Sequence, residues 1–164
     1  MRPLLVLDLN RCVVESSHKG IPGCTPDAKA RTKYVYLRPH LKEFLAFLFE
    51  HFDVGVWSSN IPENVLCIAK IAFGDYFERL RFVFTRDDCD KGPNYSTKKD
   101  LRRVWDAFPH WGPENTFLLD DESDKVKESQ MGNYIPVYPF DPQQKAKDEG
   151  LPTLKKYLQT RFVM

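Results

Sequence analysis

An aspartate and an asparagine follow a short apolar run near the amino terminus of the chain. Residues 4–7 are all aliphatic, as in a buried strand, and Asp8-Leu9-Asn10 comes directly after them. Open α/β sheets place their chemistry at the carboxyl ends of the strands, where a carboxylate could attack phosphorus or bind a metal ion. The alternative is that Asp8 is only a turn residue ending a strand. Asn10 cannot be a general acid or base, because an amide has no proton to exchange at a useful pKa.

Three later polar clusters are also expected at the carboxyl edge of the predicted sheet. Ser58-Ser59-Asn60 and Asp120-Asp121 each follow an apolar run, and Lys98-Lys99 follows a polar loop. In a parallel sheet the carboxyl ends of the strands lie along one edge, so these clusters should converge with Asp8. A nucleophilic carboxylate, a hydroxyl, a lysine and a pair of acids suit phosphoryl transfer, which depends on charge neutralisation and in-line positioning. Each cluster alone would only indicate the start of a loop.

Apolar runs alternate with segments of helical periodicity along the chain. Strands are predicted at residues 4–7, 34–37, 54–57, 82–85, 116–119 and 135–137, and helices at 39–49, 61–72, 97–108 and 151–162. Asn60 and Glu63 resemble a capping box at the start of the second helix, and Gly74 should end it. The main strands are continuous apolar runs, which is typical of a parallel sheet covered on both faces. We therefore predict an α/β fold, a three-layer, doubly wound and mostly parallel sheet, in a single domain over residues 1–164.

The combined pattern resembles the haloacid dehalogenase superfamily. More narrowly, it is similar to the NLI-interacting-factor-like proteins and the small phosphatases of the RNA polymerase II carboxy-terminal domain, which share an FCP1-homology domain. Their D-L-D-x-T-L-V motif is matched by residues 8–14 and their R-P-x-x-x-E-F-L segment by residues 38–45. Their F-T-A-S, K-D-L and L-D-[DN]-S motifs are matched by residues 57–60, 99–101 and 119–123. The resemblance covers roughly residues 4–137.

The resemblance implies a catalytic and metal-binding role for the acids. Asp8 would attack phosphorus and form an aspartyl-phosphate. Mg²⁺ would be held by the Asp8 carboxylate, the main-chain carbonyl of Asn10 and Asp120, with Asp121 outside the ligand shell or acting through water. Oxygen ligands of this kind suit that ion.

The resemblance also implies a phosphate-binding role for two polar segments. Ser58 would donate a hydrogen bond to a phosphate oxygen, within a substrate-binding segment completed by Ser59 and Asn60. Lys99 would pair with the phosphate and with the catalytic carboxylate. Two lysines in the first turn of the predicted helix would oppose its macrodipole, which indicates a use for one of them. Lys98 and Lys99 are adjacent, so only one can face the site.

Asn10 departs from the family pattern at the position of the acid that protonates the leaving oxygen and then activates water. General acid–base catalysis contributes about 10²–10⁴-fold. Two functions follow: a pseudophosphatase of low or no activity that binds phosphoproteins or assembles a complex, or an active Mg²⁺-dependent phosphoserine/threonine protein phosphatase. Asn10 favours the first, and retention of the other motif residues favours the second. Charged neighbours that could replace the lost acid are Arg11, Glu15, Asp87 and Asp88. Cys12, in place of threonine, is a second departure.

The substrate should be a phosphorylated protein segment. The intervals 11–37 and 61–97 are too short for a folded cap domain that would enclose a small metabolite. We therefore expect a capless, open site beside a short flap hairpin. A basic patch could bind RNA, but it lies where the site would be and would more simply serve an anionic phosphopeptide. It consists of Lys98, Lys99, Arg102 and Arg103, with Arg79, Arg81 and Arg86 earlier in the sequence.

Composition limits the remaining classes. The net charge of +1 gives no global field for binding nucleic acid. No apolar stretch approaches the roughly 20 residues of a membrane span, and no presequence is expected before the first strand. The 4 cysteines lack metal-site spacing, so reduced thiols in a cytosolic, nuclear or organelle-matrix setting are expected.

Overall fold

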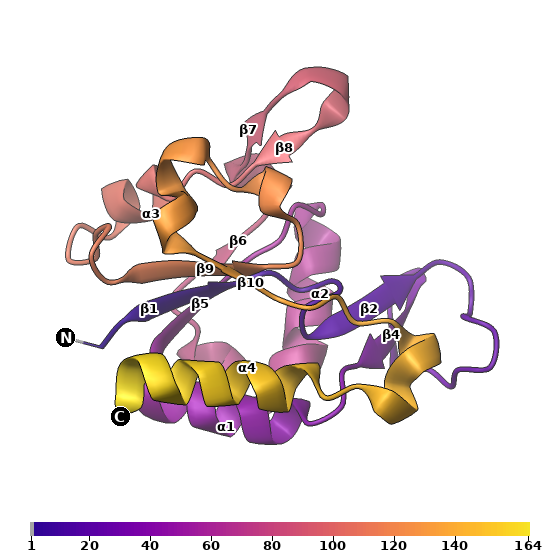
Figure 1. Cartoon of the computed structure of the whole chain (residues 1–164). Helices are drawn as coiled ribbons and strands as arrows, with labels where there is room; N and C mark the ends of the chain where they lie inside the picture. The colour runs from indigo at the N-terminus through magenta and orange to yellow at the C-terminus, as the bar shows by residue number, and fades with distance from the viewer. Residues whose placement is uncertain (1) are drawn as a thin grey trace.

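A five-stranded parallel sheet forms the centre of the molecule, which is described over residues 2–164 by a computed structural model. The strand order is β10-β9-β1-β5-β6 (Figure 1). The strands are β1 (Leu4–Leu7), β5 (Asp53–Trp57), β6 (Val83–Phe84), β9 (Thr116–Asp120) and β10 (Tyr134–Pro136). Strand β1 is central, with Leu7 opposite Val56 of β5 on one side and Leu119 of β9 on the other. The chain thus winds outward from β1 in both directions, as the predicted doubly wound fold requires.

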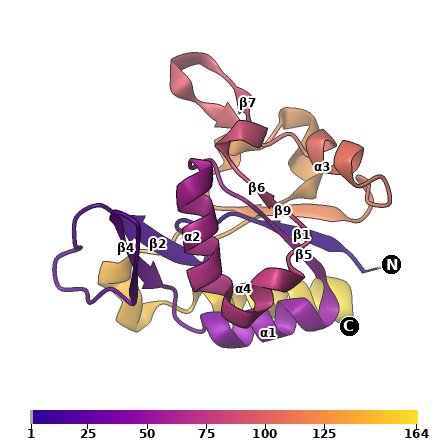
Figure 2. The same ribbon diagram turned by 180° about the vertical axis from the view of Figure 1, so that it is seen from behind.

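Helices cover both faces of this sheet (Figures 1 and 2). Helices α1 (Leu41–His51), α2 (Pro62–Phe73) and α4 (Gly150–Leu158) pack on the face that receives Leu5 and Leu7. Helix α3 (Arg102–Ala107) packs on the other face, with Leu4 and Val6. Alternate residues of β1 therefore enter two separate cores, which explains why its sequence is apolar throughout. Across residues 2–164, every helix falls short of the length and hydrophobicity needed to cross a membrane.

Two small antiparallel sheets project beyond the carboxyl ends of the central strands (Figure 1). The first has the order β2-β4-β3, formed by β2 (Val14–Ser17), β3 (Ala28–Ala30) and β4 (Lys33–Leu37). It occupies the segment predicted to be a short flap hairpin, with one strand more than expected. The second is the hairpin of β7 (Asp90–Lys91) and β8 (Thr97–Lys98).

Short 3₁₀ turns and one π-helical turn complete the chain. The 3₁₀ turns are Gly74–Arg79, Arg86–Asp88, Pro93–Tyr95, Ser123–Lys125, Glu128–Asn133 and Pro142–Lys147. The π-helical turn, Gln159–Val163, extends α4.

The predicted helix from residue 97 is wrong at its start. Residues 97–98 form β8, and α3 begins only at Arg102. Lys99 lies between them in an isolated bridge with Val126, and its N–H donates to the Lys125 carbonyl. Pairing with a distant segment thus replaces the helical hydrogen bonds, and the macrodipole argument for these lysines does not hold.

The capping box predicted for α2 is also wrong, although the end of the helix is confirmed. The N-cap is Ile61, without a side-chain cap, and the Asn60 Oδ1 atom accepts a hydrogen bond from the Ile61 N–H at 2.7 Å. Gly74 ends α2 with a φ of 53°, a backbone conformation that glycine adopts without strain. The first helix begins at Leu41 rather than at Pro39, because His40 has a φ of 68°.

Candidate active site

A buried lysine joins the carboxylates at the ends of β1 and β9. The Lys99 Nζ atom lies 2.7 Å from Asp120 Oδ2 and 3.2 Å from Asp8 Oδ1. All three side chains are buried. The parallel register of β1 and β9 continues past the strand ends, where the Asp8 N–H donates to the Leu119 carbonyl. The two acids are therefore neighbours because their strands are neighbours.

The structure decides which of the two lysines faces the site. Lys98 Nζ donates to the main-chain carbonyls of Asp124 and Val126, at 2.7 and 3.4 Å. Lys99 follows in an extended segment, where successive side chains point to opposite sides, and it reaches inward. Read as a strand rather than as a helix, the sequence would have predicted this alternation but not its direction.

Within residues 2–164, Asp121 belongs to both groups of side chains that could hold a metal ion, one with Asp8 and Cys12 and the other with Asp120 and Glu122. One ligand atom each from Asp8, Cys12 and Asp121 lie within 4.8 Å of one another. In contrast, both oxygens of Asp120 already accept hydrogen bonds, from Lys99 Nζ and from the Glu122 N–H at 2.9 Å. This geometry groups Asp8 with Asp121, whereas the family resemblance had implied Asp120 as the ligand.

The charges of this cluster do not balance. Burial raises the pKa of the Asp8 carboxyl to about 8, and repulsion from Asp120 and Asp121 adds to it despite attraction to Lys99. Burial and the same repulsion also raise the pKa of Asp121. Burial lowers the pKa of Lys99, but Asp8 and Asp120 outweigh it and hold that pKa above its ordinary value. Three acids around one buried ammonium leave an excess of negative charge that a divalent cation would compensate.

A cavity of about 210 Å³ opens beside Asp8. Its lining includes all of the predicted substrate-binding segment, and the full set is Asp8, Asn10, Arg11, Ser58, Ser59, Asn60, Arg86, Asp121 and Glu122. Ser58 is fixed by its N–H, which donates to the Phe84 carbonyl, and by its Oγ, which accepts from the Asn60 N–H at 3.2 Å. The predicted residues thus meet at the end of the sheet.

Two arginines bring positive charge to this cavity. Arg11, with φ 68°, places its Nε 3.5 Å from Asp121 Oδ2. Arg86 follows β6, and its N–H donates to the Asn60 carbonyl at 2.9 Å. The sequence named Arg11 only as a charged neighbour of Asn10 and Arg86 only with the basic patch. It could not place either at the cavity, because both lie in irregular loops whose path depends on the strands around them.

The predicted basic patch is arranged differently. Arg102 pairs with Asp100 at 2.6 Å, and Arg103 pairs with Asp90 at 3.0 Å. Neither arginine lines the cavity beside Asp8. Of the predicted patch, Arg102 and Arg103 therefore lie outside the lining of this cavity, whereas Arg86 belongs to it.

Asn10 lines the cavity, and a hydrogen bond holds the oxygen of its side-chain amide. Its Oδ1 accepts a hydrogen bond from Ser16 Oγ at 3.0 Å. Glu15 turns away to accept from the Ser16 N–H, and burial raises the pKa of its carboxyl. Within residues 2–164, the carboxylates lining the cavity are those of Asp8, Asp121 and Glu122.

The other candidates for proton transfer differ in whether they line the cavity. Asp88 accepts from the Thr85 N–H in a capping box. Neither Asp87 nor Asp88 lines the cavity, whereas Arg11 does. An arginine is a poor proton donor, because it stays protonated at all physiological pH values.

Arg38 supports the loop that follows Asn10. Its guanidinium is buried and donates to the Cys12 carbonyl at 3.0 Å and to the Arg11 carbonyl at 3.4 Å. It also pairs with Asp148 at 3.1 Å. The segment matched by R-P-x-x-x-E-F-L therefore ties the loop of residues 11–12 to the carboxy-terminal part of the chain.

The fold and the site define a phosphatase-like protein of the haloacid dehalogenase superfamily. The chain belongs to the NLI interacting factor-like phosphatase family, whose sequence profile matches residues 3–162.

Individual relatives agree with this assignment. The chain is 29% identical over 145 residues to a CTD phosphatase-like protein of Invertebrate iridescent virus 6, a match that covers 82% of this chain and 75% of the relative. It is 27% identical over 162 residues to an uncharacterized FCP1 homology domain-containing protein of Schizosaccharomyces pombe, covering 85% of this chain and 62% of that protein.

Solved structures show the same fold. The structure of fission yeast Fcp1, an RNA polymerase II CTD phosphatase, bound to beryllium fluoride superposes with a TM-score of 0.61 and 18% identity. The match covers 98% of this chain but only 50% of the Fcp1 chain, so this chain spans about half the length of that protein.

Proposed function

We propose that this protein is a phosphatase-like binding module: it holds Mg²⁺ and a phosphorylated protein segment beside Asp8, and Asn10 makes its turnover slow. The single observation that carries the proposal is the combination found in one cavity. Asp8 and Asp121 line this cavity together with Asn10, an amide at the position of the proton-transferring acid, and the buried Lys99 contacts Asp8.

Mg²⁺ would be held by Asp8, Asp121 and the main-chain carbonyl of Asn10. These are hard oxygen ligands, and the unbalanced negative charge around Asp8 supports a cation there. When bound, the ion would neutralise phosphate charge. Asp120 would then have a different task, which is to hold Lys99 beside Asp8.

The phosphate would meet several donors in the cavity. Ser58 offers a hydroxyl, and Arg11 and Arg86 offer charged donors that suit phosphate geometry. Because the Asn10 Oδ1 is occupied by Ser16, its amide nitrogen remains to donate. An ionised acid at this position would repel a phosphate dianion, whereas an amide donates at every pH. The change at residue 10 thus removes proton transfer and favours binding.

A phosphorylated side chain on a protein is the class of ligand that the surroundings suit. The cavity is small and lies on the side from which the β2–β4–β3 sheet and the β7–β8 hairpin project (Figure 1). Fission yeast Fcp1 is an RNA polymerase II CTD phosphatase and the viral relative is named a CTD phosphatase-like protein, which supports a protein ligand.

A binding titration tests the proposal. A fluorescent phosphoserine peptide should bind in Mg²⁺, and its unphosphorylated form, or the same peptide in EDTA, should bind at least tenfold more weakly. The variants Asp121→Ala and Ser58→Ala should lose this difference. Asp75→Ala, at an exposed acid of the turn after α2, is the matched control and should keep it. Equal affinity for both peptides, unaffected by EDTA, would refute the proposal.

The second candidate function is an active phosphatase. It is favoured by the retained contact between Lys99 and Asp8, which a pure binding module would need less. The two candidates differ in the rate at which an aspartyl-phosphate is hydrolysed.

A further inference from the structure

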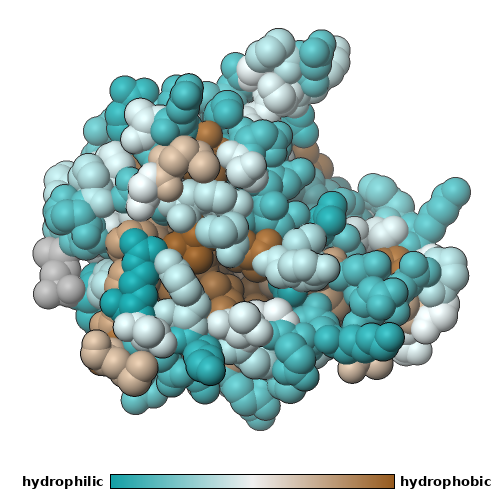
Figure 3. Space-filling view, in the orientation of Figure 1, coloured by the Kyte–Doolittle hydropathy of each residue, from teal (hydrophilic) through white to brown (hydrophobic). Residues whose placement is uncertain are grey.

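An apolar groove lies between the outer strand of the sheet and the last helix. We call it the β10–α4 groove; its volume is about 610 Å³. Its lining is mostly apolar and consists of Ile135, Pro136, Val137, Tyr138, Glu149, Gly150, Thr153, Leu154 and Tyr157. The space-filling view shows brown surface hollowed in the middle of this face, surrounded by polar residues (Figure 3).

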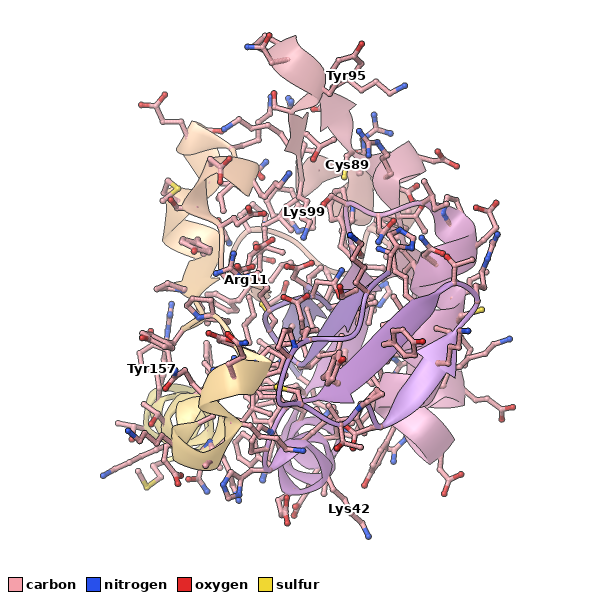
Figure 4. All side chains as sticks on the ribbon, turned by 90° about the vertical axis from the view of Figure 1, so that its right-hand side faces the viewer. Arg11, Lys42, Cys89, Tyr95, Lys99 and Tyr157 are labelled. Carbon is pink, nitrogen blue, oxygen red and sulfur yellow. The ribbon has the colours of Figure 1, made fainter. Side chains whose placement is uncertain are left out.

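A second cavity connects this groove to the site. It has a volume of about 420 Å³ and shares Tyr138, Glu149 and Gly150 with the groove. It also shares Arg11 with the cavity beside Asp8. In the view onto this side of the molecule, Arg11 lies between Lys99 and Tyr157 (Figure 4). The second cavity therefore adjoins both the candidate phosphate site and the β10–α4 groove.

We propose that the β10–α4 groove receives an apolar side chain of the same protein segment whose phosphorylated residue enters the cavity beside Asp8. This inference rests on the proposed function and specifies a sequence feature of the phosphorylated segment that would bind. The segment would carry a large aliphatic or aromatic residue on one side of the phosphorylated residue. Between the two, its main chain would cross Arg11, Gln144 and Lys147, which line the connecting cavity.

The exposed aromatic residues of the groove support a protein ligand. Tyr138 is 79% exposed and Tyr157 is 45% exposed, and both border the same apolar surface. Tyrosine combines a large apolar body with a polar end and is enriched at protein interfaces. Leu154 and Val137, both buried, form apolar parts of the lining.

A second copy of this chain is a weaker candidate for the occupant. Self-association at a sheet edge usually occurs by strand addition, which needs main-chain donors on the edge strand. Strand β10 has only three residues, and one of them is Pro136, which has no N–H. The groove therefore favours insertion of a side chain over pairing of strands.

A leucine scan of a phosphopeptide tests the inference. Phosphoserine peptides in a glycine-serine background would carry one leucine, moved through every position on both sides of the phosphoserine. Binding in Mg²⁺ should tighten about tenfold or more when the leucine reaches the groove, as expected for burial of one such side chain. The gain should occur on one side of the phosphoserine only.

Variants of exposed residues identify the surface that binds the leucine. Tyr157→Ala and Thr153→Arg should remove most of the leucine gain and leave the affinity of the leucine-free phosphopeptide unchanged. Tyr95→Ala is the matched control, because Tyr95 is 93% exposed at the tip of the β7–β8 hairpin, on the far side of the site from Tyr157 (Figure 4). The Tyr95→Ala variant should keep the full increase in affinity that the leucine gives.

The outcomes separate this inference from the proposed function. If the leucine-free phosphopeptide binds in Mg²⁺ but no leucine position improves it, the groove inference alone is overturned. It is likewise overturned if Tyr95→Ala removes the gain as fully as Tyr157→Ala does, or if Tyr157→Ala converts a dimer into a monomer in sedimentation and spares the leucine gain. If no phosphopeptide binds, both proposals fail.

Discussion

Replacing Asn10 with aspartate should accelerate the hydrolytic step that we propose Asn10 makes slow. The two side chains have the same shape, so one carboxylate oxygen of the Asn10→Asp variant can still accept from Ser16 Oγ, now 3.0 Å from Oδ1. The other oxygen takes the place of the amide nitrogen and can carry a proton. Asn10 lines the cavity, so this oxygen can reach a bound phosphate or water.

The magnitude follows from the charges around residue 10. General acid–base catalysis contributes about 10²–10⁴-fold. Asp8 and Asp121 line the same cavity, and their charges would raise the pKa of an acid introduced at residue 10. A raised pKa helps the acid to protonate a leaving group but weakens it as a base at neutral pH. We therefore expect a gain near the lower end, about 10²-fold in the steady rate, or roughly 3 kcal/mol of barrier.

Rapid-mixing kinetics with an aryl phosphate provide the assay. The phenol is a good leaving group, so Asp8 can form the aspartyl-phosphate without a general acid to protonate that group. Hydrolysis of the aspartyl-phosphate then limits the rate. The parent protein should release a burst of phenol and then continue slowly, and Asn10→Asp should raise only the slow phase. Lys99→Met should abolish the burst in both backgrounds, because Lys99 Nζ contacts Asp8 at 3.2 Å.

One result would refute this reasoning. If the parent protein hydrolyses alkyl phosphates as fast as Asn10→Asp, another residue supplies the proton. Glu122, the exposed carboxylate of the cavity lining, would be tested next with Glu122→Gln. If neither protein shows a burst, the active-phosphatase function is excluded and the binding function gains.

Three further predictions concern stability. The pKa of Asp8 rises from 3.8 to about 8 on folding. The free energy of unfolding of the metal-free protein should therefore decrease as the pH rises between those values, by an amount on the order of a few kcal/mol. In the Asp8→Asn variant this decrease should be absent. Arg38→Leu leaves the buried Asp148 carboxylate without its charged partner, with only the Gly150 N–H donating to it, and should cost about 3–5 kcal/mol in urea unfolding. Gly55→Ala drives a methyl group into the packed ring of Phe82 and should cost about 1–3 kcal/mol.

Each stability prediction has its own control. Thermal melts in EDTA should show Asp8→Asn more stable than the parent at pH 8 but not at pH 4; a gain of equal size at both would contradict the pKa argument. Adding Asp148→Leu to Arg38→Leu should recover part of the loss, and so should adding Phe82→Leu to Gly55→Ala. An unchanged loss in either double variant would show that the named contact is not the cause.

Local patterns in the sequence were sufficient to predict the architecture. The aliphatic run at residues 4–7 can be buried on two faces only inside a parallel sheet, and β1 is the central strand. The position of Asp8 directly after that run, and of Asp120 at the end of β9, followed from the same pattern. Such predictions succeed because burial on a strand or helix depends on the spacing of apolar residues within one element.

The division of roles inside the site depended on tertiary contacts. Whether Asp120 or Asp121 can bind a metal depends on Lys99, whose position is set by pairing with Val126, far along the chain. The helix predicted at residue 97 was wrong for the same reason, since the distant strand-like pairing competes with local helical hydrogen bonds.

The surfaces around the site likewise required the folded chain. The β10–α4 groove and the cavity lined by Arg11 become neighbours only when β10 and α4 are placed side by side. The sequence by itself thus predicted the sheet, the position of Asp8 at its edge, and an amide at Asn10 where the family pattern has an acid. Only the tertiary structure decided which charges compensate one another and where a bound segment could lie, because those depend on distances between residues that no local pattern relates.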